Sequence, residues 1–120
     1  MANPFVHAEL QTQSLGKSVE FYGQLFNWEL EEMPMGDSDE KYTVIRVGDG
    51  VGGGMMQHPI ADAPSCWVPY VDVENLIQST EKAKNLGATV LKENCEVPEM
   101  GSFSIIQDPT GAVMGLWQNK

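Results

Sequence analysis

F-S-I-I-Q-D-P-T-G-A-V-M-G-L-W-Q, residues 103 to 118, decides the fold because an earlier stretch of the chain repeats it. Y-T-V-I-R-V-G-D-G-V-G-G-G-M-M-Q, residues 42 to 57, aligns with it without a gap at an offset of 61 residues. Four of the 16 pairs are identical, and the two stretches share an apolar pattern and a glycine turn. The identical pairs are Ile45/Ile106, Gly50/Gly111, Gly54/Gly115 and Gln57/Gln118. Such a repeat predicts that the chain is one structural unit written twice.

Length and composition predict one globular domain that is built from both copies. The chain has 120 residues, of which 42% are hydrophobic and 20% are charged. A unit of about 60 residues is only marginally stable alone, because small units bury too little surface. We therefore expect the two halves to share a core, or to pair with halves of another chain.

Charge and targeting signals exclude several functional classes. A formal net charge of −10 repels a phosphate backbone, so nucleic acid is not an expected partner. The N-terminus lacks the basic start and apolar region of a secretory signal, and no run of 18 apolar residues predicts a membrane span. Cys66 and Cys95 form no C-x-x-C pair. These features predict a cytoplasmic protein with free thiols.

Hydrophobic periodicity predicts the same order of elements, β-α-β-β-β, in each half. The first half has strands at 5–12, 28–33, 42–47 and 51–57, a helix at 17–26 that Ser14 caps, and a turn or loop at 34–40. The second has strands at 66–71, 88–92, 102–107 and 112–118, a helix at 73–85 that Asp72 caps, and a loop at 94–101. At the helix starts the two halves align at an offset of 58.

The predicted domain organisation follows from these elements. Residues 1–120 form a single domain, with a first module at about 4–58 and a second at about 65–118. Two prolines and several small residues mark a linker at about 58–64.

Two segments resemble the vicinal oxygen chelate superfamily, which includes glyoxalase I, extradiol dioxygenases and bleomycin-binding proteins. They are the helix S-V-E-F-Y-G-Q-L-F-N-W at 18–28 and the turn and strand D-P-T-G-A-V-M-G-L-W at 108–117. The resemblance covers about residues 4 to 118. It implies an α+β fold of two βαβββ modules in tandem, each curling into half a barrel, so that together they enclose a cup-shaped site. It also implies a homodimer.

The resemblance identifies four positions at which metal-binding members carry their ligands. In this sequence these positions are His7, Gly54, Ser65 and Gly115, and only His7 fits. A catalytic divalent ion needs about three protein ligands. We therefore favour a site without a metal or other cofactor. The alternative is a divalent metal bound by His7, Glu9 and His58.

Strand alternation predicts the lining of the cup. His7, Glu9 and Gln11 share one strand face, and Met56, Trp67 and Trp117 add apolar and aromatic walls. Gly54 and Gly115 remove side chains and are expected to open room. Apolar walls with a few polar groups are typical of a small-molecule pocket. The alternative is that these aromatic residues simply fill the core.

The glycine run at 52–54 lies inside a predicted strand and no helix follows it, so it is not a phosphate loop. A bulge or a close approach of another backbone explains it better.

Two functions remain open, so the sequence does not decide whether the protein is an enzyme. The first is a binding protein similar to bleomycin-binding members, for which the negative charge and aromatic rings favour a cationic ligand. The second is a lyase or oxygenase-like enzyme, with a non-standard metal or with His7 or Glu9 as general base on a small carbonyl or diol substrate.

Overall fold

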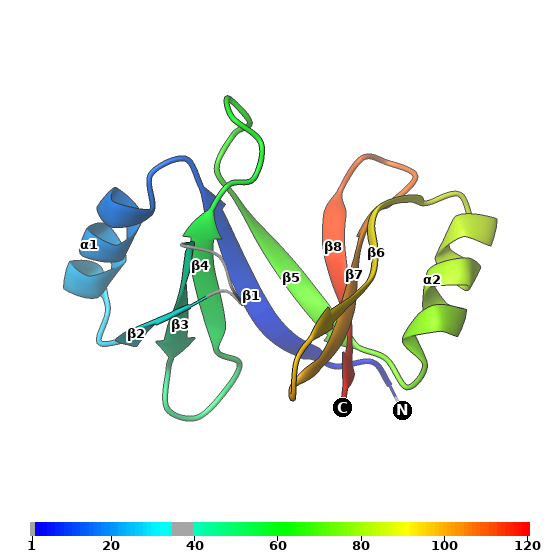
Figure 1. Cartoon of the computed structure of the whole chain (residues 1–120), viewed down its shortest axis with the longest axis horizontal. Coiled ribbons are helices and arrows are strands. Elements are labelled where there is room, and N and C mark those ends of the chain that lie inside the picture. Colours follow the sequence, from blue (N-terminus) through cyan, green and yellow to red (C-terminus); the bar gives the residue numbers. More distant parts are fainter. Residues whose placement is uncertain (1, 35–39) are drawn as a thin grey trace. The chain divides into compact units, whose positions relative to one another are not determined.

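A computed structural model of the chain describes residues 2–34 and 40–120. The described residues form a mixed α+β fold in which the order β-α-β-β-β occurs twice, as predicted (Figure 1). Apart from its two ends, the predicted loop at 34–40 lies outside the described residues, and Pro34 ends a strand. The first five elements are β1(Phe5–Thr12), α1(Leu15–Leu25), β2(Glu29–Pro34), β3(Lys41–Arg46) and β4(Gly53–Gln57). The second five are β5(Cys66–Asp72), α2(Leu76–Asn85), β6(Thr89–Val97), β7(Gly101–Gln107) and β8(Val113–Asn119).

The chain divides into two compact units. One is His7–Val68, and the other is Pro69–Lys120 together with the segment that precedes His7. The predicted linker at 58–64 carries no strand or helix. The arrangement of both modules in a single domain stays a prediction.

The unit His7–Val68 is a sheet with α1 on one face. Its strands follow the order β2-β3-β4-β1, with β1 parallel to β4 and the other neighbours antiparallel. Leu10, Ile45 and Met55 are buried on the face that α1 covers, with Val19 and Tyr22 of α1 against them. Because side chains alternate along a strand, the neighbours of Leu10 on β1 lie on the opposite face, which carries no helix from the described residues of this unit.

The second unit repeats this plan with the order β5-β8-β7-β6. Val73, Leu76, Ile106 and Leu116 form its buried core, and Ala83 of α2 packs against them. β5 runs parallel to β8, as β1 does to β4.

In each unit, a glutamine at or next to the end of the last strand accepts a hydrogen bond from the first N–H of the helix. The backbone N–H of Leu15 donates to the side-chain oxygen of Gln57 at 3.2 Å, and that of Leu76 donates to Gln118 at 2.6 Å. Ser14 occupies the predicted N-cap of α1, but its side chain makes no capping hydrogen bond. The identical pair Gln57/Gln118 therefore marks a capping contact that both units share.

The N-cap of α2 corrects the prediction. It is Asn75, whose side chain accepts from the N–H of Gln78, and not Asp72. Asp72 instead ends β5, where its N–H donates to the carbonyl of Pro4. The helix starts of the two units, Leu15 and Leu76, consequently match at an offset of 61, so the predicted offset of 58 is wrong.

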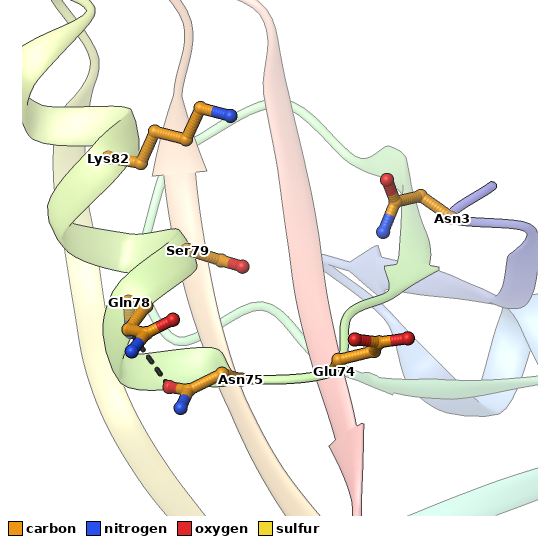
Figure 2. A pocket seen from close by; sticks show the side chains of 6 residues that line it. All are labelled: Asn3, Glu74, Asn75, Gln78, Ser79 and Lys82. Carbon is orange, nitrogen blue, oxygen red and sulfur yellow. Dashed lines mark hydrogen bonds between the residues drawn. The ribbon is translucent and has the colours of Figure 1, made fainter. Parts of the chain in front are cut away.

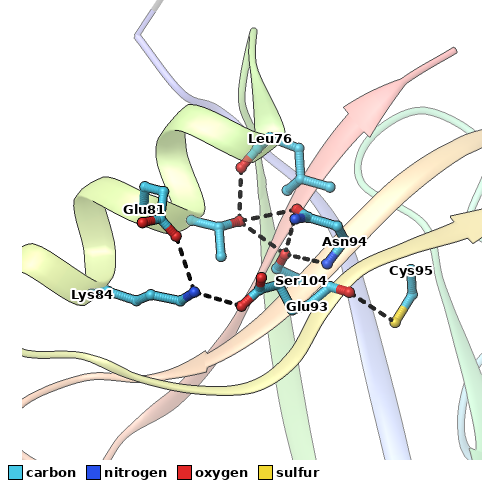
Figure 3. Close-up of polar contacts among 8 residues, drawn as sticks. Leu76, Glu81, Lys84, Glu93, Asn94, Cys95 and Ser104 are labelled. Carbon is cyan, nitrogen blue, oxygen red and sulfur yellow. Dashed lines mark hydrogen bonds and ion pairs between the residues drawn. The ribbon is translucent and has the colours of Figure 1, made fainter.

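A buried polar network lies beneath α2 (Figure 3). The hydroxyls of Thr80 and Ser104 lie 2.9 Å apart, and Ser104 also accepts from the backbone N–H of Asn94. Asn94 has a φ of 49° at an irregularity of β6, which runs to Val97 although we predicted a loop from residue 94. The hydrogen bonds to Ser104 hold this irregular strand in the sheet and extend it beyond its predicted end.

Candidate functional site

Most of the predicted polar residues lie on the face of the His7–Val68 sheet that α1 leaves uncovered. The strand register places Glu9 beside Gly54 and Gln11 beside Met56. His7 lies two residues before Glu9 on the same face of β1. Glu9 is only 7% exposed, which is unusual for a carboxylate and requires hydrogen-bond partners.

The hydroxyl of Tyr42, on β3, connects these side chains. It donates to Oε1 of Glu9 at 3.0 Å and lies 2.7 Å from Nε2 of His7. The other carboxylate oxygen of Glu9 accepts from the amide of Gln11 at 3.0 Å. We call His7, Glu9, Gln11 and Tyr42 the tyrosine network.

The directions of these bonds determine which ring nitrogen of His7 carries a proton. Tyr42 has one hydroxyl proton, which it donates to Glu9, so Nε2 of His7 carries a proton and donates to the hydroxyl oxygen. Burial lowers the pKa of His7 below its ordinary value, and the negative charge of Glu9 opposes this with a smaller effect. The imidazole is therefore neutral at pH 7.

Tyr42 also occupies the space beside Gly54. A Cβ added at Gly54 would lie 2.0 Å from the hydroxyl oxygen of Tyr42. The expectation that this glycine opens room is wrong, because the tyrosine ring fills that room. At Gly53 an added Cβ would lie 2.0 Å from the carbonyl oxygen of Ala8, which confirms the close backbone approach predicted for the glycine run.

In the second unit, a tyrosine ring likewise fills the space beside the corresponding glycine. A Cβ at Gly115 would lie 2.3 Å from the ring of Tyr70, which is 5% exposed and contacts Phe103 edge-on. Phe103 pairs with Trp117 across β7 and β8, and the Trp117 ring lies close to Gly101. The helix-free face of this unit is therefore aromatic around Gly115, whereas that of the first unit is polar around Gly54.

Sequence reasoning missed both tyrosines. A glycine inside a strand signals the close approach of another group. Tyr42 begins the repeated stretch, and β3, which carries it, pairs with the strand that contains Gly54. Side-chain alternation alone does not say which neighbouring residue fills a space, so the pairing of strands was needed to identify them.

The metal positions also require a correction. With the offset of 61, the residue that corresponds to His7 is Val68, not Ser65, and it is 1% exposed. Valine has no ligand atom. The backbone N–H of His58 donates to the carbonyl of Thr12, five residues along β1 from His7, or about 16 Å at the rise of a strand. Across residues 2–34 and 40–120 no group of three His, Cys, Asp or Glu side chains is arranged to hold a metal ion.

Trp67 lies elsewhere than predicted. Its ring is 5.5 Å from that of Tyr22 and 6.4 Å from that of Trp28, measured between centroids. Tyr22 belongs to α1 and packs on the Leu10 face of the sheet. Trp67 is thus placed with the aromatic residues of the helix side, not with His7, Glu9 and Met56.

An open depression of about 310 Å³ lies beside the start of α2 (Figure 2). It is lined by Asn3, Glu74, Asn75, Gln78, Ser79 and Lys82, and contains none of the predicted site residues. Its lining side chains are all polar, unlike the mostly apolar wall of a typical small-molecule pocket.

No helix within the described part of the chain has the length and apolarity to cross a bilayer.

Known proteins resemble the chain in sequence and in structure. "Putative glyoxylase CFP32" of Mycobacterium bovis and of Mycobacterium tuberculosis are each 28% identical over 108 residues, which are 90% of this chain and 41% of theirs. The chain thus matches less than half the length of these curated relatives.

Solved structures share the fold at low sequence identity. The hypothetical protein BH1468 from Bacillus halodurans superposes with a TM-score of 0.74 at 11% identity, covering 100% of this chain and 96% of the other. Methylmalonyl-CoA epimerase from Mycobacterium tuberculosis superposes with a TM-score of 0.72 at 14% identity, covering 97% and 87%.

The family assignment rests on a sequence match that spans most of the chain. A sequence model described as the Glyoxalase/Bleomycin resistance protein/Dioxygenase superfamily matches residues 5–115. The repeated β-α-β-β-β order and the structural neighbours agree with this match. The chain belongs to the Glyoxalase/Bleomycin resistance protein/Dioxygenase superfamily.

Proposed function

We propose that the protein binds a small organic molecule at the helix-free face of the His7–Val68 unit, through the tyrosine network and without a metal ion. The observation that carries this proposal is the Tyr42 hydroxyl, which lies within hydrogen-bond distance of both His7 and Glu9. A divalent ion would need those two ligand atoms to converge on it, and the phenol takes that place.

The network supplies polar atoms in a fixed orientation. Glu9 is held by Tyr42 and Gln11, and Met56, on the same face beside Gln11, offers an apolar contact. A few oriented polar groups beside apolar atoms are what small-molecule sites use for orientation and specificity.

Binding in the presence of a chelator tests this proposal. We would record amide chemical shifts of labelled protein with EDTA while titrating small aromatic carbonyl compounds, and repeat the titration with zinc or nickel. We expect shifts at His7, Glu9 and Gln11 that are equal with and without metal. Shifts that occur only with metal, or only at the aromatic residues of α1, would contradict it.

A second candidate function is proton transfer, with Glu9 as general base. A buried carboxylate in contact with a phenol and a neutral imidazole can take a proton from an enolisable carbonyl compound. The names of two relatives, a glyoxylase and an epimerase, fit acid–base chemistry at such a compound. Exchange of the α-hydrogen of a small ketone or thioester in D₂O would detect it, and the rate with Glu9→Gln protein should fall to background.

The compartment and assembly are part of the same proposal. Cys66 and Cys95 are free thiols, and the chain is strongly acidic. We propose a cytoplasmic homodimer that does not bind nucleic acid.

A further inference from the structure

We infer that the site of the tyrosine network selects ligands with a protonated amine and rejects carboxylates and phosphates. This inference rests on the proposed function, and it adds the chemical class of the ligand. Its basis is the direction of each hydrogen bond in the network, together with the charges of the unit that carries it.

The donors of the network are directed at its own oxygen atoms. The Tyr42 hydroxyl and the Gln11 amide both donate to Glu9, and Nε2 of His7 donates to Tyr42. An anion that enters this site finds at most the second N–H of the Gln11 amide, and it has to break one of these bonds to obtain a further donor. It also has to approach the carboxylate of Glu9, which is repulsive at short range.

The histidine does not compensate for that repulsion. Because its pKa is lowered by burial, the imidazole of His7 is uncharged at neutral pH. The guanidinium of Arg46, whose β3 position is on the same face, is paired with Glu31. A carboxylate or phosphate ligand therefore meets one paired cation and a neutral ring.

The net negative charge of the whole His7–Val68 unit strengthens the preference for cationic ligands. Its sequence contains ten acidic residues and three basic ones, Lys17, Lys41 and Arg46. This excess sets a negative potential, which raises the local concentration of cations and lowers that of anions. An ammonium group also offers three donors to a surface of acceptors.

The preference would separate this chain from some of its structural neighbours. Methylmalonyl-CoA epimerase, by its name, acts on a thioester with a free carboxylate. That kind of anionic substrate is the class that the tyrosine network disfavours. The shared fold therefore does not imply that this chain and the epimerase act on the same class of substrate.

Two probes of equal shape and opposite charge test the inference. Benzylammonium and benzoate would be titrated into the full chain at pH 7.5 with EDTA, and binding followed by amide chemical shifts. We expect benzylammonium to bind at least about tenfold more tightly than benzoate, which corresponds to about 1.4 kcal/mol. This comparison uses the unmodified protein and does not depend on the folding of any variant.

Two variants assign the preference to a residue. Glu9→Gln should reduce benzylammonium affinity at least about tenfold, while Glu20→Gln, with the same loss of charge at an exposed position of α1, should reduce it less than about threefold. Circular dichroism confirms that each variant is folded.

The outcomes distinguish this inference from the function on which it rests. If benzoate binds as tightly as benzylammonium at the tyrosine network, the selection for amines is overturned while the binding function stands. Equal losses in Glu9→Gln and Glu20→Gln would also overturn it, because the charge of the whole unit would then explain the preference. If neither probe shifts the network residues at tens of millimolar, both the inference and the proposed function fail.

Discussion

At the scale of single residues, Tyr42 determines the character of the site. Its ring takes the space that Gly54 leaves, and its hydroxyl joins Glu9 to His7. Gly54 and Tyr42 therefore depend on each other: a side chain at residue 54 would displace the ring, and a smaller residue at 42 would leave a gap beside a buried carboxylate.

Tyr42→Phe should destabilise the protein while keeping the ring in place. The change removes the donor to Oε1 of Glu9 and leaves that buried carboxylate with one hydrogen bond fewer. We expect a loss of about 1–3 kcal/mol in the free energy of unfolding, measured with urea. Tyr22→Phe is the control, because it removes the same atom from a ring in the aromatic cluster of α1; a loss of equal size there would contradict a special role for Tyr42.

The lowered pKa of His7 predicts that stability depends on pH. Because burial lowers this pKa, the unfolded chain binds the proton more tightly than the folded chain does. The stability contributed by neutral His7 is complete above the ordinary value of 6.5 and is lost as the pH falls from there toward the folded pKa.

Urea unfolding between pH 8 and pH 5 measures this effect. His7→Gln should flatten the dependence in that range, whereas His58→Gln, at the end of β4, should leave most of it. An unchanged slope in His7→Gln would mean that another group titrates.

At the scale of elements, the two units use the same contacts to start their helices and to place their last strands. Gln57 and Gln118 each accept a hydrogen bond from the first N–H of the helix in their own unit. The end of the last strand and the start of the helix are thereby joined.

Replacing either glutamine should weaken one helix start. Gln57→Ala and Gln118→Ala each remove an acceptor at a helix N-terminus, and we expect each to cost about 0.5–2 kcal/mol of unfolding free energy. Hydrogen exchange should become faster at Leu15 in the first variant and at Leu76 in the second. Gln24→Ala, on the exposed surface of α1, is the matched control and should change neither. Faster exchange at both helices in one variant would show that the caps are not local.

Gly53→Ala should disrupt the parallel pairing of β1 with β4. An added Cβ would meet the carbonyl oxygen of Ala8 at 2.0 Å, and the atoms of Ala8 that it meets are all backbone atoms, which cannot yield as a flexible side chain can. We expect a loss of more than about 2 kcal/mol, by chemical denaturation. Gly16→Ala is the control because nothing lies within 4 Å of its added Cβ, and in a helix this change should be neutral or stabilising by up to about 1 kcal/mol. Equal effects would argue against the clash.

At the scale of the whole molecule, each unit carries one polar or aromatic helix-free face and one helix with exposed apolar residues. Phe21, Leu25 and Phe26 of the α1 region are more than two-fifths exposed, and so are Ile77 and Leu86 at α2. Exposed large apolar side chains are common on monomers when scattered, but contiguous ones mark interfaces.

We expect a homodimer in solution. Light scattering after gel filtration should give twice the chain mass of 13.2 kDa, and Phe21→Ser with Phe26→Ser should shift the mass toward the monomer if α1 forms the contact. A monomeric mass at micromolar concentration would contradict the dimer. A dimer that these substitutions do not affect would place the contact elsewhere.

The sequence by itself determined the α+β class and the repeated β-α-β-β-β order, because periodicity and turn residues are local signals and the repeat is found by comparing the chain with itself. The family followed from the resemblance of whole segments to known members, which the sequence match over residues 5–115 confirms. It also indicated that His7, Glu9 and Gln11 share a face, since alternation along one strand needs no partner. Only the tertiary structure decided what fills the space at Gly54 and Gly115, where Trp67 lies and which glutamine caps each helix. These facts depend on which strands and helices pack together over dozens of residues, and side-chain contacts of that range leave no periodic trace in a single sequence.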